Sequence, residues 1–178
     1  PNKNARLITP VGTIRRTFRV PETMWAGVQA LPQLLAAFCV PRHPVVAELA
    51  PLVRDALQMA TGEAHIRGYE PGNRVRVQAV IAAVYGVLSG LGLTFAATPA
   101  QVAEEGDMVR LPEELLRAQR GSSLDLSLLA AALLEYLGLR PLLLVTTGQV
   151  LVGCWTVKDH LPFAAVDSGL RIQNLAEM

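Results

Sequence analysis

Two adjacent serines, Ser122 and Ser123, stand where this chain is best placed to do chemistry. They follow a turn at Gly121 and open a run, residues 123–137, that would be apolar on nearly every face of a helix. Such a helix must be buried along its length, so its first turn should point from the core toward a cleft. The free N–H groups and positive dipole end of that turn favour an anion or an activated nucleophile, and the residue in place here is a serine.

Three other fragments accompany this run in a fixed order. Arg110-Leu-Pro112 precedes it, and Gly148-Gln-Val-Leu-Val-Gly-Cys-Trp155 and Ala165-Val-Asp167 follow it. Together with Arg120-Gly-Ser-Ser-Leu-Asp-Leu-Ser-Leu-Leu129, they resemble bacterial transglutaminase-like domains of the papain-like superfamily. The matching motifs of that family read Arg-Leu-Pro, Arg-Gly-Thr-Cys-Leu-Asp-Leu-Ala-Leu-Leu, Gly-His-Ala-Phe-Val-Gly-Val-Trp and Asp. The resemblance covers residues 104–169, just over a third of the chain.

The resemblance implies the positions of a Cys–His–Asp triad: Ser123 replaces the cysteine, Gln149 replaces the histidine, and Asp167 keeps the aspartate. In such a triad the helix dipole and the imidazole convert the cysteine to a thiolate, and the aspartate orients the imidazole. A serine hydroxyl is far less acidic and needs a base, whereas a glutamine amide takes up no proton near neutral pH. Losing one triad member typically lowers turnover by ~10³-fold or more. The degenerate triad therefore predicts a catalytically inactive pseudoenzyme domain.

The double replacement favours natural degeneration over engineering, because a single substitution is enough to trap an enzyme. A second hypothesis nevertheless keeps the chain an active hydrolase of the peptidase or amidase type. Its nucleophile would be Ser123 or Cys154, and its base an unrecognised group such as His160. The sequence favours plainer roles, since Cys154 lies in an apolar strand where a packing cysteine is expected, and His160 lies in a loop.

Other polar and aromatic residues receive structural or supporting roles. Ser122 and Trp155 are candidates to line the cleft, although Trp155 could instead fill the core. Asp125, in the first turn of the buried helix, is expected to be a hydrogen-bonded structural acid that matches the helix dipole. His43 and His65 fall in the helical half and are assigned surface or capping roles.

The elements that must position these residues follow from hydrophobic periodicity, prolines and glycines. Helices are predicted over residues 21–40 with a kink or split near Pro32, over 44–60 with a break near Pro51, over 73–91, from Pro112, and over 123–137. Strands are predicted within 6–20 and over 142–147, 150–157 and 163–166. The order predicts an α+β fold with a transglutaminase-like core, in which the long helix packs on a small antiparallel sheet. Its parts would be an N-terminal strand segment 1–20, a helical subdomain 21–120 and a transglutaminase-like core 121–178.

Composition limits the possible functions. The 178 residues are 51% hydrophobic and 17% charged with a net charge of +1, which argues against a nucleic-acid partner. The uncharged apolar runs are too short to cross a bilayer, so no membrane partner is expected. Two isolated cysteines, Cys39 and Cys154, fit a reducing cytoplasm. No ligand cluster predicts a metal and no glycine-rich phosphate loop predicts a cofactor.

Arginine outnumbers lysine 14 to 2, which indicates a GC-rich bacterial genome. The chain starts at Pro1 rather than at a methionine, so we expect a domain of a larger bacterial protein. Its partners would then be other domains of that protein, or a separate protein or peptide.

Overall fold

The computed structural model describes residues 23–25, 32–66, 69, 74–96, 107–146, 149–157 and 171–174. The fold is α+β, as the sequence predicts. The helices are η1 (Pro32–Phe38, a 3-10 helix), α1 (Pro44–Thr61), α2 (Arg74–Gly90), α4 (Pro112–Ala118) and α5 (Ser123–Tyr136). The strands are β1 (Thr23–Trp25), β2 (Thr94–Phe95), β3 (Asp107–Val109), β4 (Arg120–Gly121), β5 (Pro141–Thr146), β6 (Gln149–Cys154) and β7 (Arg171–Asn174).

The helix predicted over residues 21–40 is wrong in its first part, whereas residues 32–38 form a 3-10 helix that begins at the predicted split near Pro32. Strand β1 occupies part of that range and pairs antiparallel with β3, from Thr23 opposite Val109 to Trp25 opposite Asp107. Pro32 begins η1 rather than kinking a longer helix. The pairing joins segments more than eighty residues apart, so no local periodicity could have revealed it.

The break predicted at Pro51 is also wrong, because α1 continues through this proline. Pro51 lies on the exposed side of the helix, where a missing main-chain hydrogen bond costs least. On the other side, Leu49, Val53 and Leu57 are buried and hold the helix in place. The helix begins at His43, whose Nδ1 accepts a hydrogen bond from the main-chain N–H of Val45, so this histidine has the capping role that was predicted.

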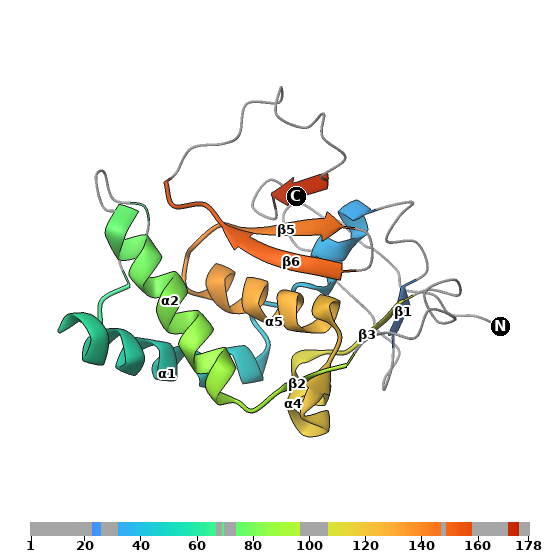
Figure 1. The fold of residues 1–178 in the computed structure, drawn as a ribbon, viewed down its shortest axis with the longest axis horizontal. Coiled ribbons are helices and arrows are strands. Elements are labelled where there is room, and N and C mark those ends of the chain that lie inside the picture. The colour runs from blue at the N-terminus through green and yellow to red at the C-terminus, as the bar shows by residue number, and fades with distance from the viewer. Residues whose placement is uncertain are drawn as a thin grey trace.

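Helix α5 forms the centre of the described fold (Figure 1). It lies between the α1–α2 pair on one side and the β5–β6 hairpin on the other, and it contacts all four elements. Most of its leucines and all of its alanines are buried, including Leu128, Leu129, Leu133 and Leu134, whereas Leu126 is half-buried. Burial of each such leucine contributes about 1.5–3 kcal/mol. Among the helices that the structure describes, none is long and apolar enough to cross a membrane.

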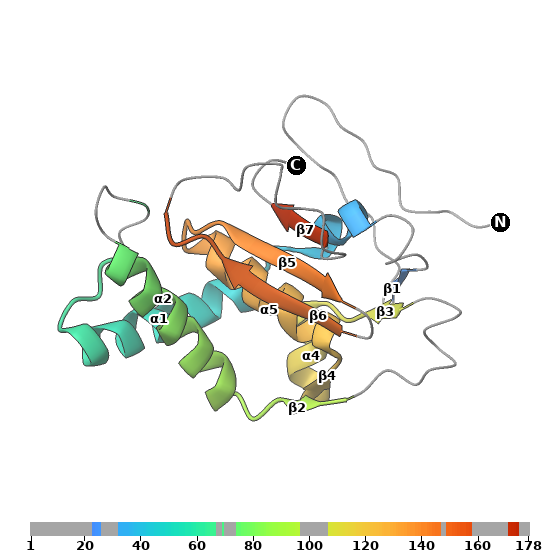
Figure 2. The same cartoon turned by 45° about the horizontal axis from the view of Figure 1, so that its top comes forward.

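The sheet next to α5 has the strand order β6–β5–β7, with both pairs antiparallel. The hairpin register places Val145 opposite Val150 and Thr146 opposite Gln149. Figure 2 shows this hairpin lying across α5, with β7 on its far side. Strand β7 was not predicted, while the predicted strands within 6–20 and over 163–166 fall outside the described residues. Within the described sheet β6 is therefore an edge strand.

The hydroxyl of Tyr69 extends the β5–β6 ladder beyond its last pair. It accepts a hydrogen bond from the main-chain N–H of Arg140 at 2.7 Å and donates one to the main-chain oxygen of Trp155 at 3.0 Å. Burial raises the pKa of this phenol far above its usual value. The connection between α1 and α2 is thereby bonded to the end of the hairpin that lies opposite its turn.

Candidate functional site

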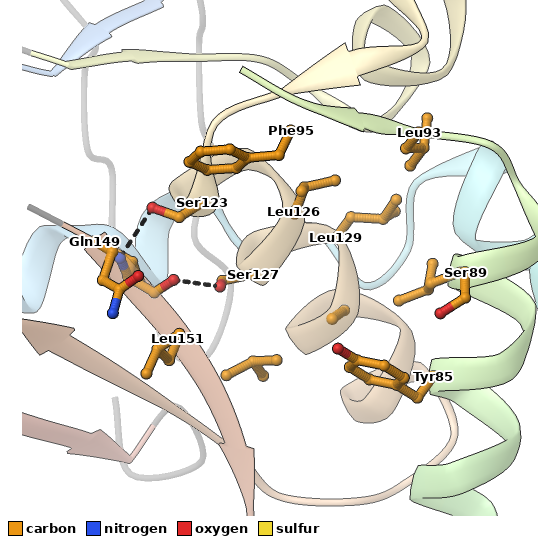
Figure 3. A pocket seen from close by; sticks show the side chains of 14 residues that line it. Tyr85, Ser89, Leu93, Phe95, Ser123, Leu126, Ser127, Leu129, Gln149 and Leu151 are labelled. Carbon is orange, nitrogen blue, oxygen red and sulfur yellow. Dashed lines mark hydrogen bonds between the residues drawn. The ribbon is translucent and has the colours of Figure 1, made fainter. Parts of the chain in front are cut away.

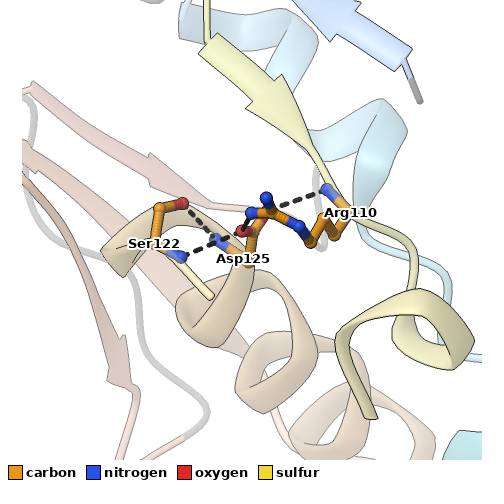
Figure 4. Close-up of polar contacts among 3 residues, drawn as sticks. All are labelled: Arg110, Ser122 and Asp125. Carbon is orange, nitrogen blue, oxygen red and sulfur yellow. Dashed lines mark hydrogen bonds and ion pairs between the residues drawn. The ribbon is translucent and has the colours of Figure 1, made fainter. Parts of the chain in front are cut away.

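The first turn of α5 is fixed by a closed set of hydrogen bonds. Ser122 is the N-cap: its Oγ accepts from the N–H of Asp125 at 3.2 Å, and Asp125 Oδ2 accepts from the N–H of Ser122 at 2.9 Å. Arg110 adds two bonds to the same carboxylate, from its main-chain N–H to Oδ1 at 2.8 Å and from Nη1 to Oδ2 at 3.1 Å (Figure 4). Asp125 is only 1% exposed, so these donors replace the water that its charge would otherwise bind. The carboxylate has the structural role that the sequence predicted.

Gly121 is required where the chain enters this turn. A Cβ at that position would collide with the Leu115 side chain and would lie 3.1 Å from the Cβ of Asp125. A glycine here lets β4 pass close to both α4, which precedes it, and α5, which follows it. The Gly-Ser pair thus determines where Ser123, the first residue of α5, points.

Ser123 and Ser127 hold the edge of β6 against α5. They lie one helical turn apart and face the same way. Ser123 Oγ accepts a hydrogen bond from the main-chain N–H of Val150 at 3.1 Å, and Ser127 Oγ donates one to the main-chain oxygen of Val150 at 2.8 Å. Figure 3 shows both bonds, and it shows Gln149 beside Ser123 at the start of the strand. The structure therefore brings Ser123 and Gln149 together, while Asp167 lies outside the described residues.

A cleft of about 620 Å³ opens along these residues. Its size falls in the range of small-molecule sites. Ser123 and Gln149 lie at one end, and Tyr85 and Ser89 of α2 lie at the other (Figure 3). The described lining residues come from four segments: Tyr85, Leu88 and Ser89 of α2; Leu93 and Phe95 at β2; Ser123, Leu126, Ser127, Leu129 and Ala130 of α5; and residues 149–152 of β6.

The cleft is apolar, and its apolar side chains continue to the surface. Tyr85 is 72% exposed, Phe95 64% and Leu151 45%, although all three are large hydrophobic residues. Among the described lining residues there is no cysteine, histidine, carboxylate, lysine or arginine. Exposed apolar side chains around a cavity of this size are typical of a binding surface. The tyrosine phenol is the one ionisable group in this described lining.

The two predicted cleft-lining residues lie elsewhere. The hydroxyl of Ser122 is used as the helix cap, where it accepts a hydrogen bond from the main-chain N–H of Asp125, and Ser122 is not among the described residues that line the cleft. Trp155 follows the far end of β6, beside Tyr69, and is not among the described residues that line the cleft. Sequence reasoning also missed Ser127, Tyr85 and Phe95. For Ser127 the four-residue spacing from Ser123 was an available signal, but nothing in the sequence distinguishes the two aromatic residues.

Cys154, the alternative nucleophile, lies outside the described lining of the cleft. Its thiol donates a hydrogen bond to the main-chain oxygen of Trp155 at 3.4 Å and lies 3.8 Å from the Tyr69 hydroxyl. Burial raises the pKa of the Cys154 thiol, although the contact with Tyr69 acts in the opposite direction. Because the thiolate is the nucleophilic form, this environment suppresses reactivity. His160, the suggested base, falls outside the described residues.

Within the described part of the chain, no three histidine, cysteine, aspartate or glutamate side chains form a group that could hold a metal ion. Comparisons of the chain with protein-family models, curated proteins and solved structures found no match.

Proposed function

We propose that this chain carries a transglutaminase-like domain in which the catalytic cleft serves binding and not catalysis. It would act as a binding or scaffolding module of a larger bacterial protein in the cytoplasm. One observation carries the proposal: Ser123 and Gln149, which the resemblance assigns to the nucleophile and base positions, line the same cleft, and its described lining has no histidine or carboxylate to take a proton.

Ser123 contributes to structure in a way that supports this function. Its Oγ accepts the N–H of Val150, which occupies one of the two lone pairs of the hydroxyl. A serine becomes a nucleophile when a neighbouring base takes its proton, and Gln149 cannot do so. The hydrogen bond instead fixes the strand that forms one wall of the cleft.

The proposal is tested first by activity. The purified chain should show no peptidase, amidase or transglutaminase turnover above the level of a Ser123→Ala variant. If the unmodified chain hydrolyses a peptide or ester and Ser123→Ala abolishes that turnover, the binding-module proposal is wrong and the serine-hydrolase hypothesis replaces it.

A second test asks whether the two positions still form the geometry of a cysteine–histidine pair. Ser123→Cys alone should yield a thiol of nearly ordinary pKa, because only the helix dipole acts on it. Ser123→Cys combined with Gln149→His should lower that pKa and speed alkylation by iodoacetamide at pH ~6 by roughly tenfold, since the gain in thiolate outweighs its lower nucleophilicity.

The matched control is Ser123→Cys combined with Gln149→Asn, which changes the same position without adding a base. Labelling must be assigned to residue 123 by peptide mapping, because Cys39 and Cys154 are also thiols. Equal alkylation rates in the histidine and asparagine variants would contradict the assignment of Gln149 to the base position.

A further inference from the structure

Strand β6 keeps part of its outer edge unpaired. Among the described strands its neighbour is β5, so its other edge faces α5 and the cleft. The main-chain N–H and C=O of Val150 point to that edge, because they bond to Ser123 and Ser127. Residues two apart in a strand direct these groups to the same side, so those of Val152 point there too. In the β5–β6 register Val152 stands two residues on from Val150, so its main-chain groups are not part of the ladder, and no other described residue bonds to them.

Helix α5 has no side chain that could complete this edge. The residue that follows Ser127 on the cleft side of the helix is Ala130, which lines the cleft and carries neither a donor nor an acceptor. Beyond Ser127, this side of α5 therefore offers no further hydroxyl group to strand β6. The main-chain N–H and C=O of Val152 thus have no partner among the described residues, and they lie beside the apolar lining of the cleft.

We propose that this edge receives an extended, uncharged and largely apolar peptide segment of a protein partner, which adds to β6 as a further strand at Val152. The proposal deepens the proposed function and rests on it, because it names the ligand of the same cleft. Main-chain groups of an added strand would pair with those of Val152. Alternate side chains would contact Leu126, Tyr85 and Phe95 in the cleft.

The lack of charged side chains in the described lining of the cleft favours an uncharged peptide. The described lining carries no lysine, arginine, aspartate or glutamate, so a charged side chain would lose its hydration there without compensation. A small apolar molecule would fill the cavity but would leave the N–H and C=O of Val152 unpaired. An extended peptide satisfies both the polar edge and the apolar walls.

The test begins with a pool of blocked hexapeptides, with acetylated N-termini and amidated C-termini, in which every position is valine, isoleucine, leucine, phenylalanine or threonine. Binding is followed through the backbone amide resonances of the ¹⁵N-labelled chain. The largest shifts should fall on Val152 and on the residues lining the cleft. Shifts that map to another face would overturn the proposal.

The tightest hexapeptide is then N-methylated on alternate residues. Methylation of the set whose N–H groups face β6 should weaken binding about tenfold or more, whereas methylation of the other set should change it less than about twofold. An equal response of the two sets would show that the peptide does not bind as an added strand.

Variants of exposed wall residues test the apolar part of the site without endangering the fold. Tyr85→Ala and Phe95→Ala should each weaken peptide binding about fivefold or more. Tyr136→Ala is the matched control, since this tyrosine is also exposed but does not line the cleft. If the control weakens binding as much as Tyr85→Ala does, the assigned walls are wrong.

The remaining outcomes separate the two proposals. If no hexapeptide binds but the uncharged apolar dye N-phenyl-1-naphthylamine binds and this binding is lost in Phe95→Ala, the cleft binds ligands without strand addition, so the inference fails and the proposed function stands. If sedimentation shows a dimer whose Val152 resonance depends on protein concentration, a second copy takes the edge and the inference fails. Turnover that depends on Ser123 would overturn the proposed function, whatever the peptides do.

Discussion

Two sides of the same helix end differ sharply in how they use polar groups. On one side of the first turn of α5, the buried carboxylate of Asp125 accepts bonds from Ser122 and Arg110. On the other side, Ser123 and Ser127 bond the edge of β6 and face a cleft whose described lining has no acid, base or cation. The described charged groups at this helix end, Arg110 and Asp125, bond to each other and to the first turn, whereas the described lining of the cleft carries no charged side chain.

The largest difference between the two sides should be in stability. Asp125→Ala removes the acceptor for the N–H of Ser122 and for two donors of Arg110, and it leaves them in a poorly hydrated place. We expect the free energy of unfolding to fall by about 2–4 kcal/mol, because hydrogen bonds to a buried carboxylate are lost while the guanidinium of Arg110 is partly exposed to water. Urea unfolding followed by circular dichroism measures this loss.

Asp125→Asn provides the matched control for that variant, because it keeps the volume and one acceptor oxygen. It should be less destabilised than Asp125→Ala. A loss below about 1 kcal/mol in the alanine variant would mean that the carboxylate is not needed for the fold, and the contrast between the two sides would then disappear.

The serine side should respond more weakly. Ser123→Ala leaves the N–H of Val150 without its partner, and Ser127→Ala does the same to the C=O. Each loss should cost about 1–2 kcal/mol, since one neutral hydrogen bond is removed and one main-chain group is left unpaired. The double variant tests whether the serines act as a unit, because both bind the same residue.

A measured interaction energy near zero would show that the two bonds are independent. A loss at Ser123 as large as that at Asp125 would contradict the weaker role assigned to this side. In that case Ser123 would be a central structural residue, and its replacement could not serve as a clean test of activity.

The parts of this fold that the sequence predicted are those encoded by local pattern. The apolar run 123–137 specified α5 to within one residue of its end, and the two apolar segments on either side of the turn at Gly148 specified the β5–β6 hairpin. The spacing of the motif fragments predicted that Ser123 and Gln149 would meet, and in the structure they lie side by side. The structural role of Asp125 followed from its place in the first turn of a buried helix.

The parts that were missed depend on contacts between distant segments. The β1–β3 pairing and the place of β7 beside β5 follow from tertiary packing, which short segments do not encode. Tyr85 and Phe95 line the cleft because α2 and β2 lie next to α5 in the fold, and local sequence does not encode that arrangement. The Tyr69 hydroxyl, which bridges Arg140 and Trp155, has no sequence signal at all.

The smallest predicted effect concerns pH, and it follows from where the titratable groups lie. Burial raises the pKa of Cys154 and of Tyr69, both at the far end of β6 and outside the described lining of the cleft. Below pH ~8.5, the ordinary thiol pKa, both groups are protonated whether the chain is folded or unfolded, so neither makes stability depend on pH.

Above that pH the unfolded chain releases the Cys154 proton while the folded chain keeps it. The free energy of unfolding then falls by at most ~1.4 kcal/mol per pH unit for each proton. Tyr69 adds a second decline above its ordinary pKa of ~10.

Unfolding curves from pH 7 to 11 should show this decline in the unmodified chain, and Cys154→Ala should flatten its first part. Tyr69→Phe should flatten the second part, at the cost of the hydrogen bonds to Arg140 and Trp155. The difference between each variant and the unmodified chain is the quantity to compare, because Cys39 also titrates in the unfolded state. Peptide binding in the cleft, measured between pH 6 and 8, should stay constant, since the described lining has no histidine, cysteine, carboxylate, lysine or arginine. A binding affinity that changes with pH in this window would place an ionisable group in the cleft and remove the contrast between its neutral side and the charged side at Asp125.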